Sequence, residues 1–354
     1  MARTTAGIIA SLAAGASLVA AHGHVSNIIV NGVYYRNYDP TTDAYNPTPP
    51  KVIGWTASNL DNGFVSPDAF GGPDIICHRD ATPGGGHATV AAGSKISIQW
   101  TPEWPESHHG PVIDYLAACN GPCETVDKTT LKFFKIDSSG YINGSVPGYW
   151  ASDALVTNGN SWLVQIPADL KAGNYVLRHE IIALHGAGSA NGAQAYPQCF
   201  NLQVTGSGSN VPAGVAGTSL YKATDAGILF SLYSSPIVYP MPGPALIAGA
   251  SSSILQSKSV ATVTSSATVP GSGSGTTVVT TTTAAVVTTT TTSSVKTTTT
   301  LSTSTTAAPA TTAAPTGSAQ TKWGQCGGSG WSGATACVAG SSCSTINPYY
   351  AQCV

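Results

Sequence analysis

Charged residues are scarce in this sequence, and neither sign dominates. Asp, Glu, Lys and Arg make up 8% of its 354 residues, with 14 basic residues against 16 acidic ones. The chain has no basic run that could bind nucleic acid or an anionic membrane. We therefore expect a neutral binding partner, and neither a nucleic-acid nor a membrane partner.

The stretch from Ala250 to Gln320 lacks Asp, Glu, Cys and aromatic residues altogether. Runs of Thr and Ser fill it, as at 288–292 and 297–300. Such a segment cannot bury enough apolar surface to offset the entropy that is lost on ordering. We predict a disordered, O-glycosylated linker over 250–320, which separates a large N-terminal part from a small C-terminal part.

Long amphipathic helical patterns are also missing between His22 and Gly249. This part instead contains short β-rich runs of mostly period-two alternation, separated by Gly and Pro clusters. The runs cover 95–100, 131–136, 161–167, 175–184 and 199–205. We predict an all-β domain over 22–249, an immunoglobulin- or fibronectin-like β-sandwich with long loops, in which 22–30 supplies the first strand.

The first 21 residues have the pattern of a secretory signal peptide. Arg3 supplies the positive charge, 8–19 form a short apolar run, and Val19-Ala20-Ala21 is a small-residue cleavage site. The run is shorter than the ~20 residues that cross a bilayer. Cleavage after Ala21 would make His22 the first residue of a secreted, extracellular protein. The alternative is a retained hydrophobic N-terminus.

The cysteine pattern agrees with export. Cys-x-x-Cys pairs, a common zinc-binding spacing, are absent, and the even count favours disulfide bonds. The eight cysteines form two groups of four on either side of the linker: Cys77, Cys119, Cys123 and Cys199, then Cys326, Cys337, Cys343 and Cys353. In the first group Cys119 and Cys123 enclose a three-residue turn suited to a local bridge, which leaves Cys77 to pair with Cys199. Asn143-Gly144-Ser145 is a glycosylation sequon in an exported chain.

A histidine at a mature N-terminus offers two nitrogen ligands, its α-amine and its imidazole. The amine has a pKa of ~7.7–8, so it loses its proton to a metal more readily than lysine does. One further imidazole would complete a T-shaped set of three nitrogens, which suits copper. His22-Gly23-His24 also fits a competing mode, in which Cu(II) or Ni(II) binds the amine, two backbone amides and the His24 imidazole. That mode needs a flexible terminus, whereas a strand is expected to begin at once.

Three further segments carry a family resemblance together with His22. They are SHHGPV at 107–112, RHEIIALH at 178–185 and GAQAYPQC at 192–199, followed by YPMPGPAL at 239–246. In this order and spacing they closely resemble the fungal lytic polysaccharide monooxygenases of auxiliary activity family nine, formerly glycoside hydrolase family sixty-one. The resemblance spans His22 to Gly249.

The resemblance implies a copper site with assigned residue roles. His22 would supply the amine and an imidazole nitrogen, and His108, rather than its neighbour His109, the third nitrogen. Tyr196 would face the metal from the axial direction, while His185 and Gln194 would hydrogen-bond the bound oxygen species. Gln194 and Tyr196 lie two residues apart on an extended run, so their side chains share a face.

The activity implied is oxidative cleavage of cellulose or a related β-glucan at the glycosidic linkage, at the anomeric carbon, C4 or both. It would need an external electron donor and dioxygen or hydrogen peroxide, and we expect a monomer. Two other hypotheses stay open, an endoglucanase-type glycoside hydrolase and a non-catalytic accessory protein that binds copper and cellulose. Hydrolysis would need two converging carboxylates. Glu180 could instead be a structural group that pairs with Arg178 or with neighbours of His185, and His185 could pair with Glu180 or with a backbone carbonyl.

The C-terminal part, 321–354, is below the ~40 residues at which a core suffices alone, so disulfide bonds must hold it. It resembles a fungal family-one carbohydrate-binding module, which implies the bridges Cys326–Cys343 and Cys337–Cys353. By the same resemblance, side chains that bind crystalline cellulose are an aromatic row and two flanking hydrogen-bonding residues: Trp323, Tyr349, Tyr350, Asn347 and Gln352. A generic small disulfide-rich domain is the alternative.

Overall fold

The computed structural model describes residues 22–269, except 102–103, 253 and 266, and residues 319–353, except 321–324, 328–332 and 348–349. The chain divides into two compact units, 1–286 and 287–354, and we describe each by itself. In the described residues, no helix is long and apolar enough to cross a membrane.

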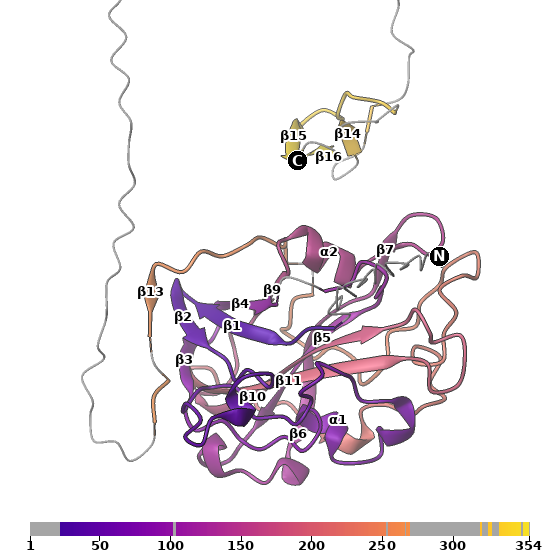
Figure 1. The fold of residues 1–354 in the computed structure, drawn as a ribbon. Coiled ribbons are helices and arrows are strands. Elements are labelled where there is room, and N and C mark those ends of the chain that lie inside the picture. Colours follow the sequence, from indigo (N-terminus) through magenta and orange to yellow (C-terminus); the bar gives the residue numbers. More distant parts are fainter. Residues whose placement is uncertain are drawn as a thin grey trace, which may run out of the picture. The chain divides into compact units, whose positions relative to one another are not determined.

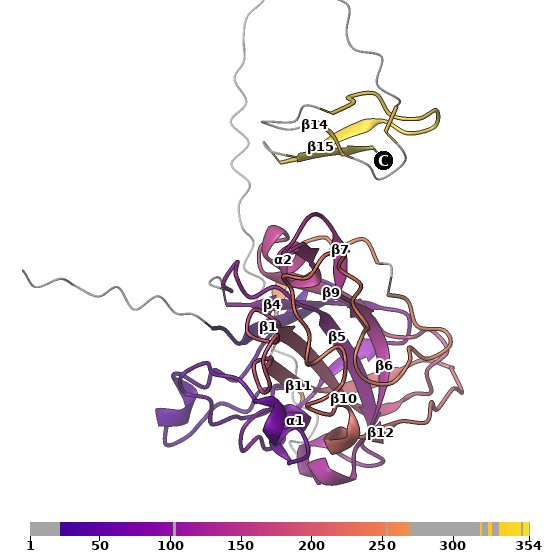
Figure 2. The same ribbon diagram turned by 90° about the vertical axis from the view of Figure 1, so that its right-hand side faces the viewer.

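Two sheets form the first unit, and Figures 1 and 2 show them as stacked layers. The first sheet has the order β13-β2-β1-β4-β9 and the second β12-β6-β5-β10-β11-β3. All pairs are antiparallel except β13 with β2 and β3 with β11. The strands of the first sheet are β1 (Val25–Val30), β2 (Val33–Arg36), β4 (Lys95–Trp100), β9 (Ser161–Gln165) and β13 (Val263–Thr264). Those of the second are β3 (Ala88–Ala91), β5 (Val112–Ala118), β6 (Lys132–Ser139), β10 (Gly173–Ala183), β11 (Gln194–Thr205) and β12 (Val215–Ala216).

Short elements in the loops complete the unit. The helices α1 (Asp74–Cys77) and α2 (Ala151–Thr157) lie at opposite ends of it (Figures 1 and 2). A hairpin joins β7 (Tyr141–Asn143) to β8 (Tyr149–Trp150), and single 3-10 turns cover Asp43–Tyr45, Pro67–Ala69, Cys123–Thr125, Lys128–Thr130 and Gly217–Ser219. The predicted β-sandwich with long loops is confirmed.

The core lies between the sheets, where alternate strand residues point inward. In β4, Ile96, Ile98 and Trp100 are buried between the sheets, as period-two alternation requires. β10 is buried on both faces because loops and α1 cover its outer side, so Leu177 joins the core between the sheets and Val176 an outer cluster. Burial on both faces explains why neighbouring residues of β10, such as Val176 and Leu177, are both apolar.

Charged residues within the buried strands are paired. The Arg178 guanidinium donates to both Glu180 carboxylate oxygens, at 2.8 and 2.7 Å, so the expected Arg178–Glu180 pairing is confirmed. The Trp100 indole donates to His179 Nε2 at 2.8 Å, and His179 Nδ1 lies 2.8 Å from the Asp114 carboxylate. His179 therefore carries a proton on Nδ1, and these groups link the two sheets.

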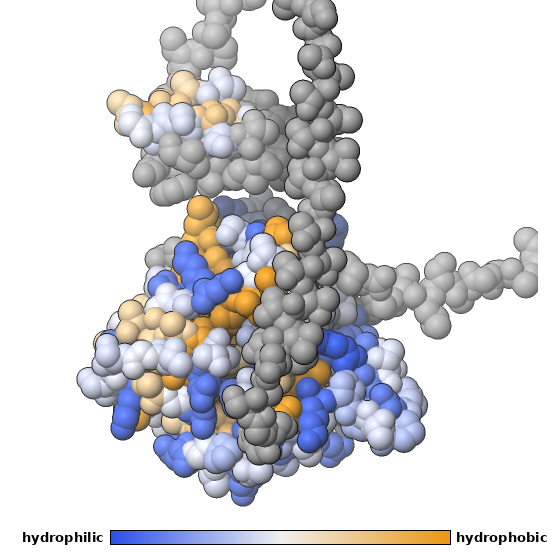
Figure 3. Space-filling model, turned by 90° about the vertical axis from the view of Figure 1, so that its left-hand side faces the viewer, coloured by the Kyte–Doolittle hydropathy of each residue, from blue (hydrophilic) through white to orange (hydrophobic). Residues whose placement is uncertain are grey.

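Part of the predicted linker belongs to the sandwich, which corrects its expected start at Ala250. The Gln256 side chain accepts from Leu163 N–H at 2.7 Å and donates to Leu163 C=O at 3.0 Å, and β13 pairs with β2. Thr268 and His87 exchange two backbone hydrogen bonds, at 2.9 and 3.0 Å. Composition missed these contacts because backbone and amide groups make them, not buried apolar side chains. Leu255 stays 72% exposed, and Figure 3 shows other apolar groups among polar ones on the side that carries β13.

The second unit is a small disulfide-bonded sheet. Its strands are β14 (Gln325–Gly327), β15 (Cys343–Asn347) and β16 (Tyr350–Cys353), in the antiparallel order β14-β16-β15. All eight cysteines of the chain are bonded, in the pairs expected from the sequence: Cys77–Cys199, Cys119–Cys123, Cys326–Cys343 and Cys337–Cys353.

Candidate metal centre

Four segments that are distant in sequence meet at one end of the sandwich. His22 precedes β1, His108 lies between β4 and β5, His185 follows β10, and Gln194 begins β11. The β10–β11 pairing sets Ala183 opposite Gln194, which brings the last two segments together.

Two glycines allow this close approach. The loop of His108 lies against β10, because Leu184 N–H donates to His109 C=O at 2.8 Å. A Cβ at Gly110 would overlap the Ile182 carbonyl oxygen, and one at Gly192 would overlap that of Gly186. Glycine at these positions thus lets the backbone bring His108, His185 and Gln194 together.

The imidazoles of His22 and His108 face each other beside Tyr196. Their ring centroids are 5.4 Å apart with the planes at 73°, and the His22 ring lies 5.8 Å from the Tyr196 ring at 30°. The His185 ring lies 4.1 Å from that of His108. Three histidines and one tyrosine therefore form a compact group.

His108 presents an unused nitrogen to this group. Its side chain is buried, and Nε2 has no hydrogen-bond partner, while Nδ1 lies 3.2 Å from the Ser107 hydroxyl. Burial, and then the neighbouring histidines, lower its pKa to about 3. The ring is therefore neutral at ordinary pH, and burial also lowers the pKa of His22. A neutral imidazole with a buried, partnerless nitrogen, lying beside a second imidazole, is suitable donor chemistry for a copper ion, so these residues fit the metal.

Tyr196 and Gln194 are joined by a hydrogen bond. The Tyr196 hydroxyl donates to Gln194 Oε1 at 2.7 Å, which leaves the Gln194 NH₂ group as a donor for another partner. Burial raises the pKa of Tyr196, so the phenol keeps its proton. Their predicted common face is consistent with this contact.

His185 is not paired with Glu180, so that alternative is wrong. Glu180 is bound instead by Arg178 and by the Tyr221 hydroxyl. His185 Nδ1 is buried without a partner, and burial lowers the pKa of this ring. His185 can therefore offer a neutral imidazole to a ligand beside His108.

The neighbouring histidines have other partners. His109 Nδ1 lies 2.9 Å from both carboxylate oxygens of Asp153. His24 Nδ1 lies 2.9 Å from the Asn62 amide oxygen, and its backbone N–H donates to the Thr101 hydroxyl at 3.3 Å. The backbone of His24 is thus bound within the fold, which contradicts the competing mode with amide ligands.

The comparisons with known proteins identify the family. Residues 22–239 match Auxiliary Activity family 9 (formerly GH61), and residues 322–350 match the fungal cellulose binding domain. The chain belongs to auxiliary activity family 9. It therefore joins a lytic polysaccharide monooxygenase domain of this family, AA9, to a C-terminal cellulose-binding module.

Relatives of this AA9 chain cover it along its length. It is 72% identical over 340 residues to AA9 family lytic polysaccharide monooxygenase H of Thermothelomyces thermophilus, covering 96% of each chain. It is 68% identical to AA9 family lytic polysaccharide monooxygenase A of Podospora anserina, in an alignment of 356 positions that covers 100% of each chain. The extended catalytic domain of H. jecorina LPMO9A superimposes with a TM-score of 0.69 and 61% identity, covering 70% of this chain and all of that one.

The AA9 site also includes aromatic residues that sequence reasoning missed. The Trp104 ring lies 5.0 Å from Tyr196 and 5.8 Å from His108, and its indole donates to His108 C=O at 3.4 Å. The Phe64 ring lies 6.2 Å from His22 and 6.0 Å from Tyr196. Trp104 could have been noticed from its place four residues before His108, whereas Phe64 lies in a long loop without any motif.

The expected residues of the cellulose-binding module fall largely outside the described part. Trp323 and Tyr349 lie outside it, and only the backbone is described for Asn347, Tyr350 and Gln352, in β15 and β16. Their roles stay predictions.

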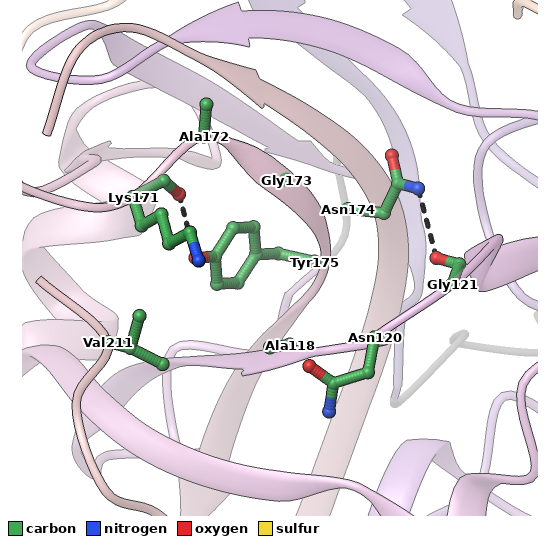
Figure 4. Close-up of a pocket in the computed structure, with 9 residues that line it drawn as sticks. All are labelled: Ala118, Asn120, Gly121, Lys171, Ala172, Gly173, Asn174, Tyr175 and Val211. Atoms are coloured by element: carbon green, nitrogen blue, oxygen red, sulfur yellow. Dashed lines mark hydrogen bonds between the residues drawn. The ribbon is translucent and has the colours of Figure 1, made fainter. Parts of the chain in front are cut away.

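A hollow of about 300 Å³ lies at the other end of β10 (Figure 4). Tyr175 lines it and donates to Lys171 C=O at 2.8 Å, while Asn174 donates to Gly121 C=O at 2.9 Å. At ~3.3 Å per strand residue, Tyr175 lies about 26 Å along β10 from Ala183. This hollow is therefore separate from the candidate metal centre.

Proposed function

We propose that this AA9 chain is a copper-dependent monooxygenase that cleaves cellulose or a related β-glucan oxidatively, with an external electron donor and dioxygen or hydrogen peroxide. The carrying observation is the partnerless, buried Nε2 of His108 beside the His22 imidazole. Copper, when bound, would supply the one-electron chemistry and the binding position for the oxidant.

The protein's own residues divide the work around that ion. His22 would hold copper through its amine and imidazole once cleavage after Ala21 has freed the amine, and His108 would hold it through Nε2. Tyr196 would present a protonated hydroxyl beside the ion. The NH₂ group of Gln194 and the imidazole of His185 would hold the oxidant by hydrogen bonds.

The carboxylates of the first unit support oxidation over hydrolysis. A glycosidase needs two carboxylates beside the scissile bond, but the buried ones already have partners. Asp114 lies against His179, Glu180 against Arg178, and Asp153 against His109. The described residues of the site supply no carboxylate pair around His22 and His108.

The rest of the chain fits a secreted enzyme that acts at an insoluble surface. We propose export with removal of 1–21, N-glycosylation at the exposed Asn143, and a monomer that adsorbs through residues 321–354. In this proposal Trp323, Tyr349 and Tyr350 stack on glucose rings, and Asn347 and Gln352 donate hydrogen bonds beside them.

The test compares cellulose incubated with the secreted, copper-loaded protein in the presence and absence of ascorbate. We expect oxidised chain ends only with ascorbate, and N-terminal sequencing should begin at His22. Equal release of unoxidised sugars without a reductant would favour a glycoside hydrolase, and copper binding without any product would favour the accessory protein.

A further inference from the structure

One turn of the long loop between β2 and β3 forms a wall of the metal centre. Within Asp61–Phe64, the Asn62 amide oxygen lies 2.9 Å from His24 Nδ1, and the Phe64 ring faces those of His22 and Tyr196. The next residue, Val65, exchanges backbone hydrogen bonds with Ala195 at 2.8 and 3.1 Å. The turn therefore contacts both the N-terminal segment and the start of β11.

Arg79 spans this turn with its guanidinium. Nε and Nη2 both donate to Phe64 C=O, at 3.0 and 2.7 Å, while Nη1 donates to the Asp61 carboxylate at 3.1 Å. The same Asp61 oxygen accepts from Gly63 N–H at 2.9 Å. One planar group thus fixes both ends of the turn, a geometry that the single ammonium of lysine does not reproduce.

The base of Arg79 is itself fixed. It follows His78, which is buried and accepts from Arg79 N–H through Nδ1 at 2.9 Å. His78 follows Cys77, the last residue of α1, whose disulfide bond to Cys199 anchors it to β11. Arg79 therefore connects a disulfide-bonded point of the second sheet to the wall of the metal centre.

Charge and position have separable effects here. Asp61 and Arg79 carry opposite charges and lie 3.1 Å apart, so the charges of the pair partly cancel at the site. The loss of the hydrogen bonds to Phe64 C=O would not be offset in this way, because Arg79 is the only donor to that oxygen among the described contacts. Loss of Arg79 should act mainly through the position of Phe64.

We propose that Arg79 is a positioning residue of the metal centre, which sets the Phe64 ring against His22 and so orients the N-terminal imidazole for copper. This inference rests on the proposed function for its metal, but the role of Arg79 in placing the Phe64 and His22 rings can also be tested in the metal-free protein.

The test uses four variants of the mature, full-length protein. Arg79→Met removes the guanidinium, Arg79→Lys keeps the charge without the fork, and Asp61→Asn removes the opposing charge but keeps an oxygen acceptor. The matched control is Arg36→Met, because Arg36 pairs with Asp43 at 2.8 Å at the start of the same loop. Copper affinity is measured by calorimetry, the Cu(II) environment by electron paramagnetic resonance, and the metal-free site by the NMR signals of the His22 and Tyr196 rings.

We expect Arg79→Met and Arg79→Lys to shift or broaden those ring signals and to weaken copper binding about 10–100-fold, the usual effect of losing a group that orients a metal ligand. Arg36→Met should stay near wild type, and Asp61→Asn should have a smaller effect than Arg79→Met, because it leaves the hydrogen bonds to Phe64 C=O in place. Unchanged ring signals and affinity in Arg79→Met would overturn the proposal, as would full recovery by Arg79→Lys. If Arg79→Met does not fold, Arg79→Lys decides. A wild-type protein that binds no copper would refute the proposed function, whereas the ring signals would still decide the role of Arg79.

Discussion

The buried carboxyl of Asp137 makes the stability of this AA9 unit depend on pH. This carboxyl is buried between the sheets, directly opposite Asp114 on β5, and it accepts a hydrogen bond from the Trp162 indole at 2.9 Å. Burial, and then the nearby Asp114, raise its pKa from 3.8 to about 8. A raised pKa in the folded state favours folding below pH 3.8, and this contribution is lost as the pH rises toward 8.

The size of the effect follows from the unfolded carboxyl, which ionises freely above pH 3.8. At 1.36 kcal/mol per unit, keeping Asp137 protonated in the fold costs about 4 kcal/mol at pH 7 and about 2 kcal/mol at pH 5. Asp137→Asn removes this cost, since its amide oxygen can accept from Trp162 and its NH₂ can donate to Asp114 Oδ2, which has no partner. We expect the variant to gain stability at pH 7, by up to that amount, and to match wild type near pH 4.

The assay is thermal unfolding of the metal-free protein between pH 4 and pH 8. For a unit of this size each kcal/mol corresponds to about 2–4 °C, so the gain at pH 7 should be several degrees. The control is Asp127→Asn, because Asp127 is exposed and only caps a 3-10 turn. A variant that is no more stable at pH 7, or whose gain is the same at pH 4, would refute the argument.

Three further predictions test other parts of the account. Gln194→Ala should keep copper in calorimetry but lose oxidative turnover about 10–100-fold, since it removes only a donor to the oxidant; turnover at the wild-type rate would exclude this role. A protein that ends at Gly249 should melt several degrees below one that ends at Val269, because it lacks the Gln256 and β13 contacts; equal melting points would show that these contacts add no stability. Deletion of 321–354 should weaken adsorption to crystalline cellulose in a pull-down and leave copper binding intact, and unchanged adsorption would remove the module from the account.

Much of the fold could be predicted because alternation marks the strands directly. The expected run 95–100 coincides with β4, and 175–184 differs from β10 by two residues at one end and one at the other. His108 of SHHGPV, and Gln194 and Tyr196 of GAQAYPQC, could be selected from the family resemblance. The two-residue repeat of a strand also places the side chains of Gln194 and Tyr196 on one face. The structure brings these residues together with His22 and His185, while their roles at copper stay predictions.

The rest depends on contacts that no local pattern encodes. Arg79 reaches Phe64 C=O across fifteen residues, and only the folded loop shows that they meet. Gln256 binds the backbone of Leu163 from a segment whose composition indicates disorder. Sequence reasoning weighs side-chain burial, so it misses ordering that arises from backbone and amide hydrogen bonds at sheet edges.

The central claim is that His22 and His108 hold one copper ion, and copper titration of two neighbouring variants tests it most directly. In the mature protein, His108→Ala should abolish tight binding, because it removes an imidazole that lies beside His22 and has a buried, partnerless Nε2. His109→Ala should bind copper as wild type does, since that ring is turned to Asp153. Tight binding in His108→Ala together with its loss in His109→Ala would contradict the account.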